Sequence, residues 1–145
     1  MSQTFQVGQR ASVPRTISES DVYLFAGITG DLNPAHTNEE YAKKTHFKTR
    51  IAHGMLSSGL ISAVLGMKLP GPGTIYTGQT LKFLAPVHIG DTITATAEIQ
   101  SLDLDRNRVV LTTTCTNQDG KVVVTGEATA LLLREGRRCS VLPPA

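Results

Sequence analysis

The sequence predicts an α+β domain in which a long antiparallel sheet curls around one buried helix. Residues 54–69 are apolar or small on every face and carry no formal charge before Lys68, which is typical of a helix wrapped by other elements. The stretch Pro-Gly-Pro-Gly at residues 70–73 ends this helix, and the hydrophobic period then changes to that of strands. The 145 residues, 40% of them hydrophobic, suit a single domain over residues 1–145 with its own core.

Composition excludes two classes of protein. The formal net charge of +2 offers no basic surface for nucleic acid, and the nearest basic cluster falls in a predicted C-terminal tail at about residues 134–145. The most apolar run is shorter than the ~18 residues that a membrane-spanning helix needs. Neither nucleic acid nor a membrane is therefore expected as a partner.

The two cysteines, Cys115 and Cys139, lie far apart and show neither a metal-ligand spacing nor a disulfide framework. Residues 1–10 lack the apolar core of a secretory signal. These observations predict free thiols in a reducing compartment, and the expected location is the cytoplasm.

Short elements are expected before the buried helix. A strand is predicted near residues 6–13, and a capping box begins a helix at Ser18. That helix is expected to end near Gly30, because a proline lies four residues further on. Asp31 then opens a loop, and Asn38 caps a second short helix with acidic residues at its start and lysines at its end.

Four long antiparallel strands are expected after the buried helix. Alternation of side chains predicts that each strand has two unequal faces, and Asp119-Gly120 is a strong hairpin signal. The predicted strands are residues 74–87, 91–104, 108–116 and 121–133. Long strands of this kind can curl around the helix.

The loop at residues 30–36, Gly-Asp-Leu-Asn-Pro-Ala-His, places the carboxylate of Asp31 and the imidazole of His36 around a rigid Asn-Pro turn. Such a pair can move protons, because histidine changes its charge near neutral pH. The structural alternative is that Asp31 makes a side-chain turn and His36 is an ordinary surface histidine, and for an arbitrary loop this alternative would be favoured.

The start of the buried helix strengthens the catalytic interpretation. Free amides at a helix N-terminus polarise oxygen, and Gly54 lets a carbonyl approach the backbone closely. The alternatives are a tight turn or close helix packing for Gly54, and a capping or packing role for His53.

These motifs together resemble the MaoC-like group of R-specific enoyl-CoA hydratases, which have the hot-dog fold. The resemblance rests on GDLNPAH at 30–36, IAHGM at 51–55, PGPGTIY at 70–76 and FLAPV at 83–87. It covers nearly the whole chain. It does not account for the residues after Leu133 or for the cluster Lys43, Lys44 and Lys48.

The resemblance implies that Asp31 and His36 hold a water molecule and add it across the double bond of a trans-2-enoyl-CoA, which gives an R-3-hydroxyacyl-CoA. The amide of Gly54 would bind the thioester carbonyl. The reaction needs no cofactor and no metal, and the four histidines lack a recognised ligand spacing. The implied roles are fatty-acid oxidation or the supply of precursors for polyhydroxyalkanoate.

Further substrate-binding candidates are Asn33, His53, Met55 and Ser62. Each has a structural alternative: Asn33 bonding the loop backbone, which is favoured, Met55 lying in the core, and Ser62 bonding its own helix. The resemblance also implies a homodimer whose sheets join edge to edge, with the CoA arm in a groove between the subunits.

Three other functions remain open. The first is a 3-hydroxyacyl-thioester dehydratase acting on acyl carrier protein, for which Lys43, Lys44 and Lys48 would form a basic rim. The second, less favoured, is a thioesterase, which would share the fold without the Asp31 and His36 loop. The third is a non-catalytic acyl-CoA-binding domain, in which substitution of Asp31 would leave ligand affinity unchanged.

Overall fold

The computed structural model describes residues 4–132, and the tail predicted at about residues 134–145 lies outside them. The elements in chain order are β1 (Arg10–Thr16), α1 (Glu19–Thr29), α2 (Pro34–Thr37), α3 (Glu39–Ala42), α4 (Gly54–Met67), β2 (Ile75–Gln79), β3 (Lys82–Phe83), β4 (Thr92–Asp103), β5 (Arg108–Thr116) and β6 (Val122–Leu131). None of the helices within these residues is long and apolar enough to cross a bilayer.

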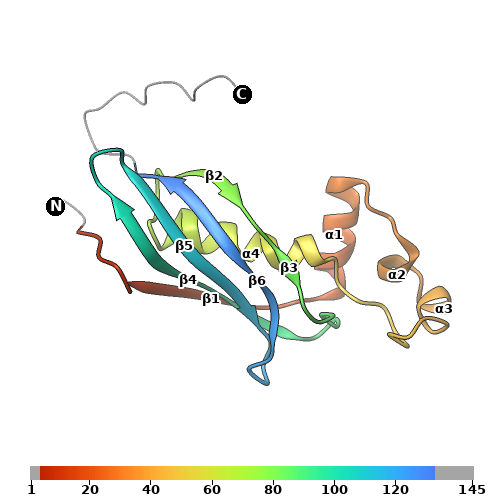
Figure 1. Cartoon of the computed structure of the whole chain (residues 1–145). Coiled ribbons are helices and arrows are strands. Elements are labelled where there is room, and N and C mark those ends of the chain that lie inside the picture. Colours follow the sequence, from red (N-terminus) through yellow and green to blue (C-terminus); the bar gives the residue numbers. More distant parts are fainter. Residues whose placement is uncertain (1–3, 133–145) are drawn as a thin grey trace.

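The strands form one antiparallel sheet in the order β1-β4-β5-β6-β2, and β3 pairs with β6. Helix α4 lies along one face of this sheet, whereas α1, α2 and α3 gather at one end of the molecule (Figure 1). This arrangement confirms the α+β prediction of a long sheet packed on a central helix.

The core lies between α4 and the sheet. Inward-facing positions of β5 alternate with exposed or half-buried ones, so Val109, Leu111 and Cys115 are buried. On β4 the small side chains of Ala95 and Ala97 are fully buried. Small residues at these positions let the helix approach the sheet closely, and the larger side chains of the helix fill the space between them.

The prediction that the central helix is buried on every side is wrong for the chain by itself. Its sheet-facing residues are buried, but Met55, Gly59 and Ser62 lie on an open face, and Met67 at the C-terminal end is 71% exposed. The sheet covers only one side of the helix. A stripe of small and apolar residues has the same sequence pattern whether it faces its own domain or another molecule.

The N-terminal helices follow the predicted caps and add one element. Ser18 and Asp21 form the capping box of α1, and Gly30 ends that helix in the left-handed region with φ 79°. The predicted loop after it contains α2, because Asn33 caps the Ala35 amide and the proline after Asn33 suits a first helical position. Asn38 caps α3 as predicted.

The strand predicted at residues 74–87 is split into β2 and β3. The register with β6 shifts between Tyr76 and Gly78. A Cβ at Gly126 of β6 would lie 1.8 Å from the Thr80 carbonyl oxygen, so only glycine allows the chain to press against β6 at this point. After Phe83 the chain leaves the sheet, in keeping with the proline at position 86.

The packing of α4 can be tested by truncation of Leu65, which is 1% exposed. The substitution Leu65→Ala removes buried methyl groups and leaves a cavity, so we expect the free energy of unfolding to fall by roughly 2–5 kcal/mol in urea denaturation. The control Val7→Ala affects a side chain that is 63% exposed, so it should change the free energy of unfolding by less than about 0.5 kcal/mol. Equal losses in the two variants would show that α4 does not carry the core.

Candidate active site

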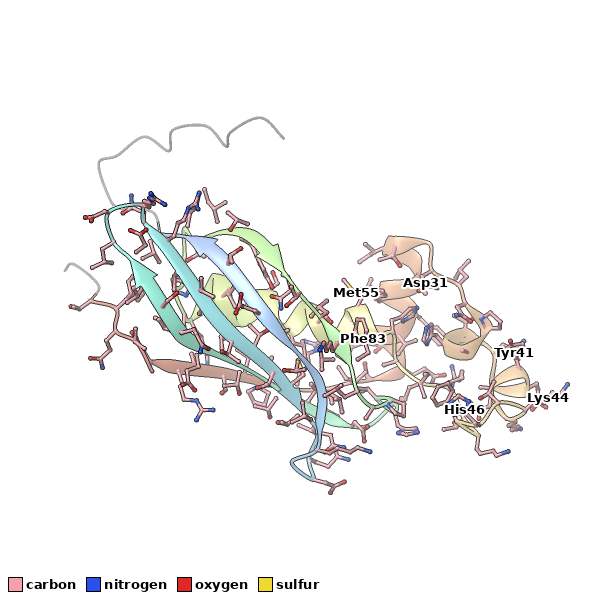
Figure 2. All side chains as sticks on the ribbon, in the orientation of Figure 1. Asp31, Tyr41, Lys44, His46, Met55 and Phe83 are labelled. Atoms are coloured by element: carbon pink, nitrogen blue, oxygen red, sulfur yellow. The ribbon has the colours of Figure 1, made fainter. Side chains whose placement is uncertain are left out.

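The candidate site lies where α1, α2 and the N-terminus of α4 meet. Asp31 follows Gly30, the C-cap of α1. His36 lies on α2, and His53 precedes the first residue of α4, Gly54. All four line a cavity of about 460 Å³. Figure 2 shows Asp31, Met55 and Phe83 in this region, whereas Tyr41, Lys44 and His46 lie at the far end of the helical segment.

His36 is held by a main-chain carbonyl. Its Nδ1 lies 2.7 Å from the Ile51 carbonyl oxygen. A carbonyl oxygen can only accept a hydrogen bond, so Nδ1 carries the hydrogen. The neutral imidazole therefore keeps a free lone pair on Nε2, which is the atom that can take a proton.

His53 is an internal support for the other two side chains. It is 2% exposed, and its Nε2 donates to the Asp31 carbonyl oxygen at 2.9 Å. Its ring centroid lies 3.9 Å from that of His36 and 4.7 Å from that of Phe25. Within residues 4–132, no group bonds its Nδ1. His53 thus fixes the Asp31 backbone and one face of the His36 ring.

The Asp31 side chain is half exposed, and one of its two carboxylate oxygens accepts a hydrogen bond from the main chain. Oδ1 accepts a hydrogen bond from the Asn33 amide at 3.2 Å, whereas Oδ2 accepts none from the described residues and lies 4.0 Å from His53 Nε2. The Asn33 side chain bonds the Ala35 amide instead of lining the cavity. This geometry agrees with the structural alternative for Asn33.

Asp31, His36 and His53 each offer a side-chain atom within 4.8 Å of the others, a spacing that could also hold a metal ion. One nitrogen of each imidazole is already bonded to a main-chain carbonyl. A metal would therefore have to use His36 Nε2 and His53 Nδ1 together with the carboxylate.

Gly54 begins α4 next to an aromatic ring. The amides of Leu56 and Ser57 bond the His53 carbonyl, so the amides of Gly54 and Met55 are left without an intrahelical acceptor. A Cβ at Gly54 would lie 2.7 Å from two atoms of the Phe83 ring. Glycine thus permits the close approach of Phe83 at the end of the helix that attracts negative charge.

The cavity is polar at one end and apolar along its walls. The walls include Phe47 and the segment 83–87, and Met55 contributes at the rim, where it is 55% exposed. Leu60, Ile61 and Leu65 of α4 are core residues and do not line the cavity. Ser62 lies on the open face of α4 and does not line the cavity, and the lysine cluster lies outside it as well.

An ionic network centred on Arg50, which the sequence motifs did not predict, lies next to the site. Arg50 donates to Glu19 at 2.6 Å, to Glu39 at 3.1 Å and to the Tyr23 hydroxyl at 2.6 Å. The hydrogen bond from Arg50 lowers the pKa of Glu19, and hydrogen bonds from Thr49 and Arg50 lower the pKa of Glu39. Because both pKa values fall below the usual range, the network stays charged at neutral pH and is lost only as acid protonates the carboxylates.

The fold and the site define a class of protein. The MaoC like domain family matches residues 2–120, and the chain belongs to this family. An (R)-specific enoyl-CoA hydratase of Rhodospirillum rubrum is 61% identical over 89% of this chain and 89% of its own length. A 3-hydroxybutyryl-CoA dehydratase of Methylorubrum extorquens is 51% identical over 85% of this chain and 78% of its own length.

Among solved structures, the chain is similar to (R)-hydratases of the MaoC-like class. The (R)-hydratase of Aeromonas caviae that is involved in polyhydroxyalkanoate biosynthesis superimposes with a TM-score of 0.87 and 41% identity. The superposition covers 91% of this chain and all of that one, 100%. The hot-dog fold expected from the sequence motifs is thereby confirmed.

The contact between Gly54 and Phe83 predicts the sign of an alanine substitution. Alanine favours a helix over glycine by up to about 1 kcal/mol, so Gly27→Ala in α1, where a Cβ meets nothing within 4 Å, should stabilise the protein. Gly54→Ala should instead destabilise it and shift the NMR resonances of the Phe83 ring. The loss should disappear in a Phe83→Ala background, measured as a double-mutant cycle of unfolding free energies. Additive effects of the two substitutions would refute the contact.

Proposed function

We propose that the protein is an R-specific enoyl-CoA hydratase that reversibly adds water to a trans-2-enoyl-CoA to give an R-3-hydroxyacyl-CoA. The observation that carries the proposal is the grouping of three features at one cavity. Within residues 4–132, Asp31 Oδ2 and His36 Nε2 accept no hydrogen bond, the Gly54 amide donates none, and most of the remaining wall residues are apolar.

The acid/base pair holds and activates the water. A water molecule between Asp31 and His36 has an acceptor on each side, so one acceptor takes its proton as the oxygen attacks the β-carbon. The same pair returns a proton to the α-carbon on the same face of the double bond. An acid/base pair in position contributes roughly 10²–10⁴-fold to the rate.

The start of α4 stabilises the charge that develops on the substrate. As water adds, negative charge builds up on the thioester oxygen. The amide of Gly54 donates to that oxygen, and the helix dipole has its positive end there. Removal of one such donor typically costs about 10²–10³-fold in kcat. The apolar wall at residues 83–87 receives the acyl chain, with Met55 at its rim.

The other candidate residues act around this centre. His53 supports Asp31 and His36 from behind, and Asn33 fixes the loop between them by capping α2. Ser62 belongs to the open face of α4, where it would meet a neighbouring subunit. No cofactor takes part in the reaction.

A second candidate is the reverse reaction on 3-hydroxyacyl groups carried by acyl carrier protein. It is favoured by the exposed Lys44 and Lys48, which lie on either side of the cavity residue Phe47 in the sequence. An acidic carrier protein would be attracted by this charge.

For the enoyl-CoA hydratase we infer a cytoplasmic location, where CoA thioesters are used and where a free thiol such as that of Cys115 is stable.

We also propose that the protein is a homodimer. The open face of α4, with Met55, Gly59 and Ser62, carries no charge, and two strands, β1 and β2, end the sheet of the described residues. A second copy would cover such a face and pair such an edge. The groove between the two copies would then take the CoA arm.

The hydratase proposal predicts that crotonyl-CoA loses its conjugated ultraviolet absorbance and yields only the R product. Asp31→Asn and His36→Gln should each lower kcat by roughly 10²–10⁴-fold. Asp119→Asn, at an exposed aspartate in the turn between β5 and β6 and outside the cavity, should leave kcat unchanged. Turnover of carrier-protein thioesters alone would favour the dehydratase, and binding without turnover of either substrate would identify a non-catalytic acyl-CoA-binding domain.

The dimer proposal predicts a change of mass when charge is placed on α4. A side chain at Gly59 meets nothing within 4 Å in the single chain, so Gly59→Glu should fold but break a dimer formed through that face. Light scattering after size-exclusion chromatography should show the mass halved. The control Ser20→Glu, in the exposed first turn of α1, should remain a dimer. A dimeric Gly59→Glu variant would place the interface elsewhere.

A further inference from the structure

Arg50 joins the three segments that carry the candidate site. Its guanidinium donates to Glu19 and Tyr23 of α1 and to Glu39 of α3, and its side chain is only 15% exposed. Its own main chain belongs to the segment that leads into α4. Asp31 follows α1, and His36 lies on the short helix just before α3. One side chain therefore fixes the relative placement of all three.

The network reaches His36 through the next residue of the chain. Glu39 Oε2 accepts from both the main-chain amide of Arg50, at 3.2 Å, and its Nε, at 3.1 Å. Ile51 then donates its amide to the Ala35 carbonyl at 3.2 Å and accepts the His36 Nδ1 hydrogen at 2.7 Å. The Ile51 carbonyl is therefore held from two sides. Glu39 binds the residue before it, and the Ala52 amide of the same peptide unit donates to the Val87 carbonyl at 2.7 Å.

We propose that Arg50 is a positioning residue that favours one tautomer of His36, because it holds the main chain on the N-terminal side of the Ile51 carbonyl while the Val87 carbonyl holds the C-terminal side. Arg50 does not line the cavity and so acts through His36 rather than on the substrate. With the carbonyl in place, Nδ1 keeps the hydrogen and Nε2 keeps its lone pair for the reacting water. If the carbonyl moves, the other tautomer becomes accessible, and Nε2 then carries a hydrogen and cannot accept one.

The chemistry of the network requires arginine at this position. The three nitrogens of the planar Arg50 guanidinium donate to three different acceptors on two helices, which are Glu19, Glu39 and Tyr23. A lysine has a single nitrogen and cannot reach all of them with the same main-chain geometry. Arg50→Lys should therefore keep the charge and lose most of the positioning.

The experiment compares Arg50→Gln with Arg15→Gln. Arg15 also pairs with a carboxylate of α1, Asp21, at 2.7 Å, but it has no connection to the cavity. Long-range ¹H–¹⁵N spectra of the imidazoles report the His36 tautomer without any substrate. We expect the Nδ1-hydrogen form in the wild type and in Arg15→Gln, and a mixture of tautomers in Arg50→Gln.

The kinetic part rests on the proposed hydratase function. With crotonyl-CoA, we expect Arg50→Gln to lower kcat by roughly 10–100-fold, with KM within about threefold of the wild type. Arg50→Lys should show a similar loss, whereas Arg15→Gln should keep kcat. If Arg50→Gln does not fold, Glu39→Gln weakens the same interaction by removing the carboxylate charge that binds Arg50, and it should give the same tautomer mixture.

Two results would overturn the proposal. One is a wild-type His36 spectrum in folded Arg50→Gln or Glu39→Gln, which would leave Arg50 with a role in stability alone. The other is a raised KM with unchanged kcat, which would make Arg50 a binding residue. A wild-type protein without hydratase activity would reject the proposed function, while the tautomer measurement would still decide the role of Arg50.

Discussion

The hydrogen bond from His36 Nδ1 to the Ile51 carbonyl is the interaction on which the candidate site depends. It joins a residue of α2 to the segment that starts α4, and it decides which imidazole nitrogen faces the chemistry. His53 is held in the same way, because its Nε2 donates to the main-chain carbonyl of Asp31. A main-chain carbonyl thus orients each of the two imidazoles.

Much of the site could be predicted from local sequence. Asp31, His36 and Gly54 lie within two short motifs, and the structure brings all three to one cavity. Local rules also predicted the Ser18 cap and the end of α1 at Gly30, because each depends on residues within one or two helical turns. The sequence carries such information directly.

Features that depend on contacts across the fold could not be predicted in this way. The split between β2 and β3 arises where Gly126, far along the chain, admits the Thr80 carbonyl. Arg50 gave no signal, because its carboxylate partners lie 31 and 11 residues away on separate helices. The open face of α4 was misjudged for a related reason: apolar spacing reveals that a surface is covered but does not reveal by which molecule.

The position of Gly54 shows how the fold and the proposed chemistry constrain each other. A free amide at the start of α4 is useful only if a substrate oxygen can approach it, and the Phe83 ring already packs against the same residue. A Cβ at position 54 would lie 2.7 Å from two atoms of that ring, so any other residue there requires the ring to move. Phe83 is 54% exposed and lies on the two-residue strand β3, whereas Val87 at the other end of the same segment is 4% exposed and belongs to the core. An acyl chain bound as proposed is therefore expected to be accommodated by movement of the Phe83 ring, while the main chain near Val87 stays in place.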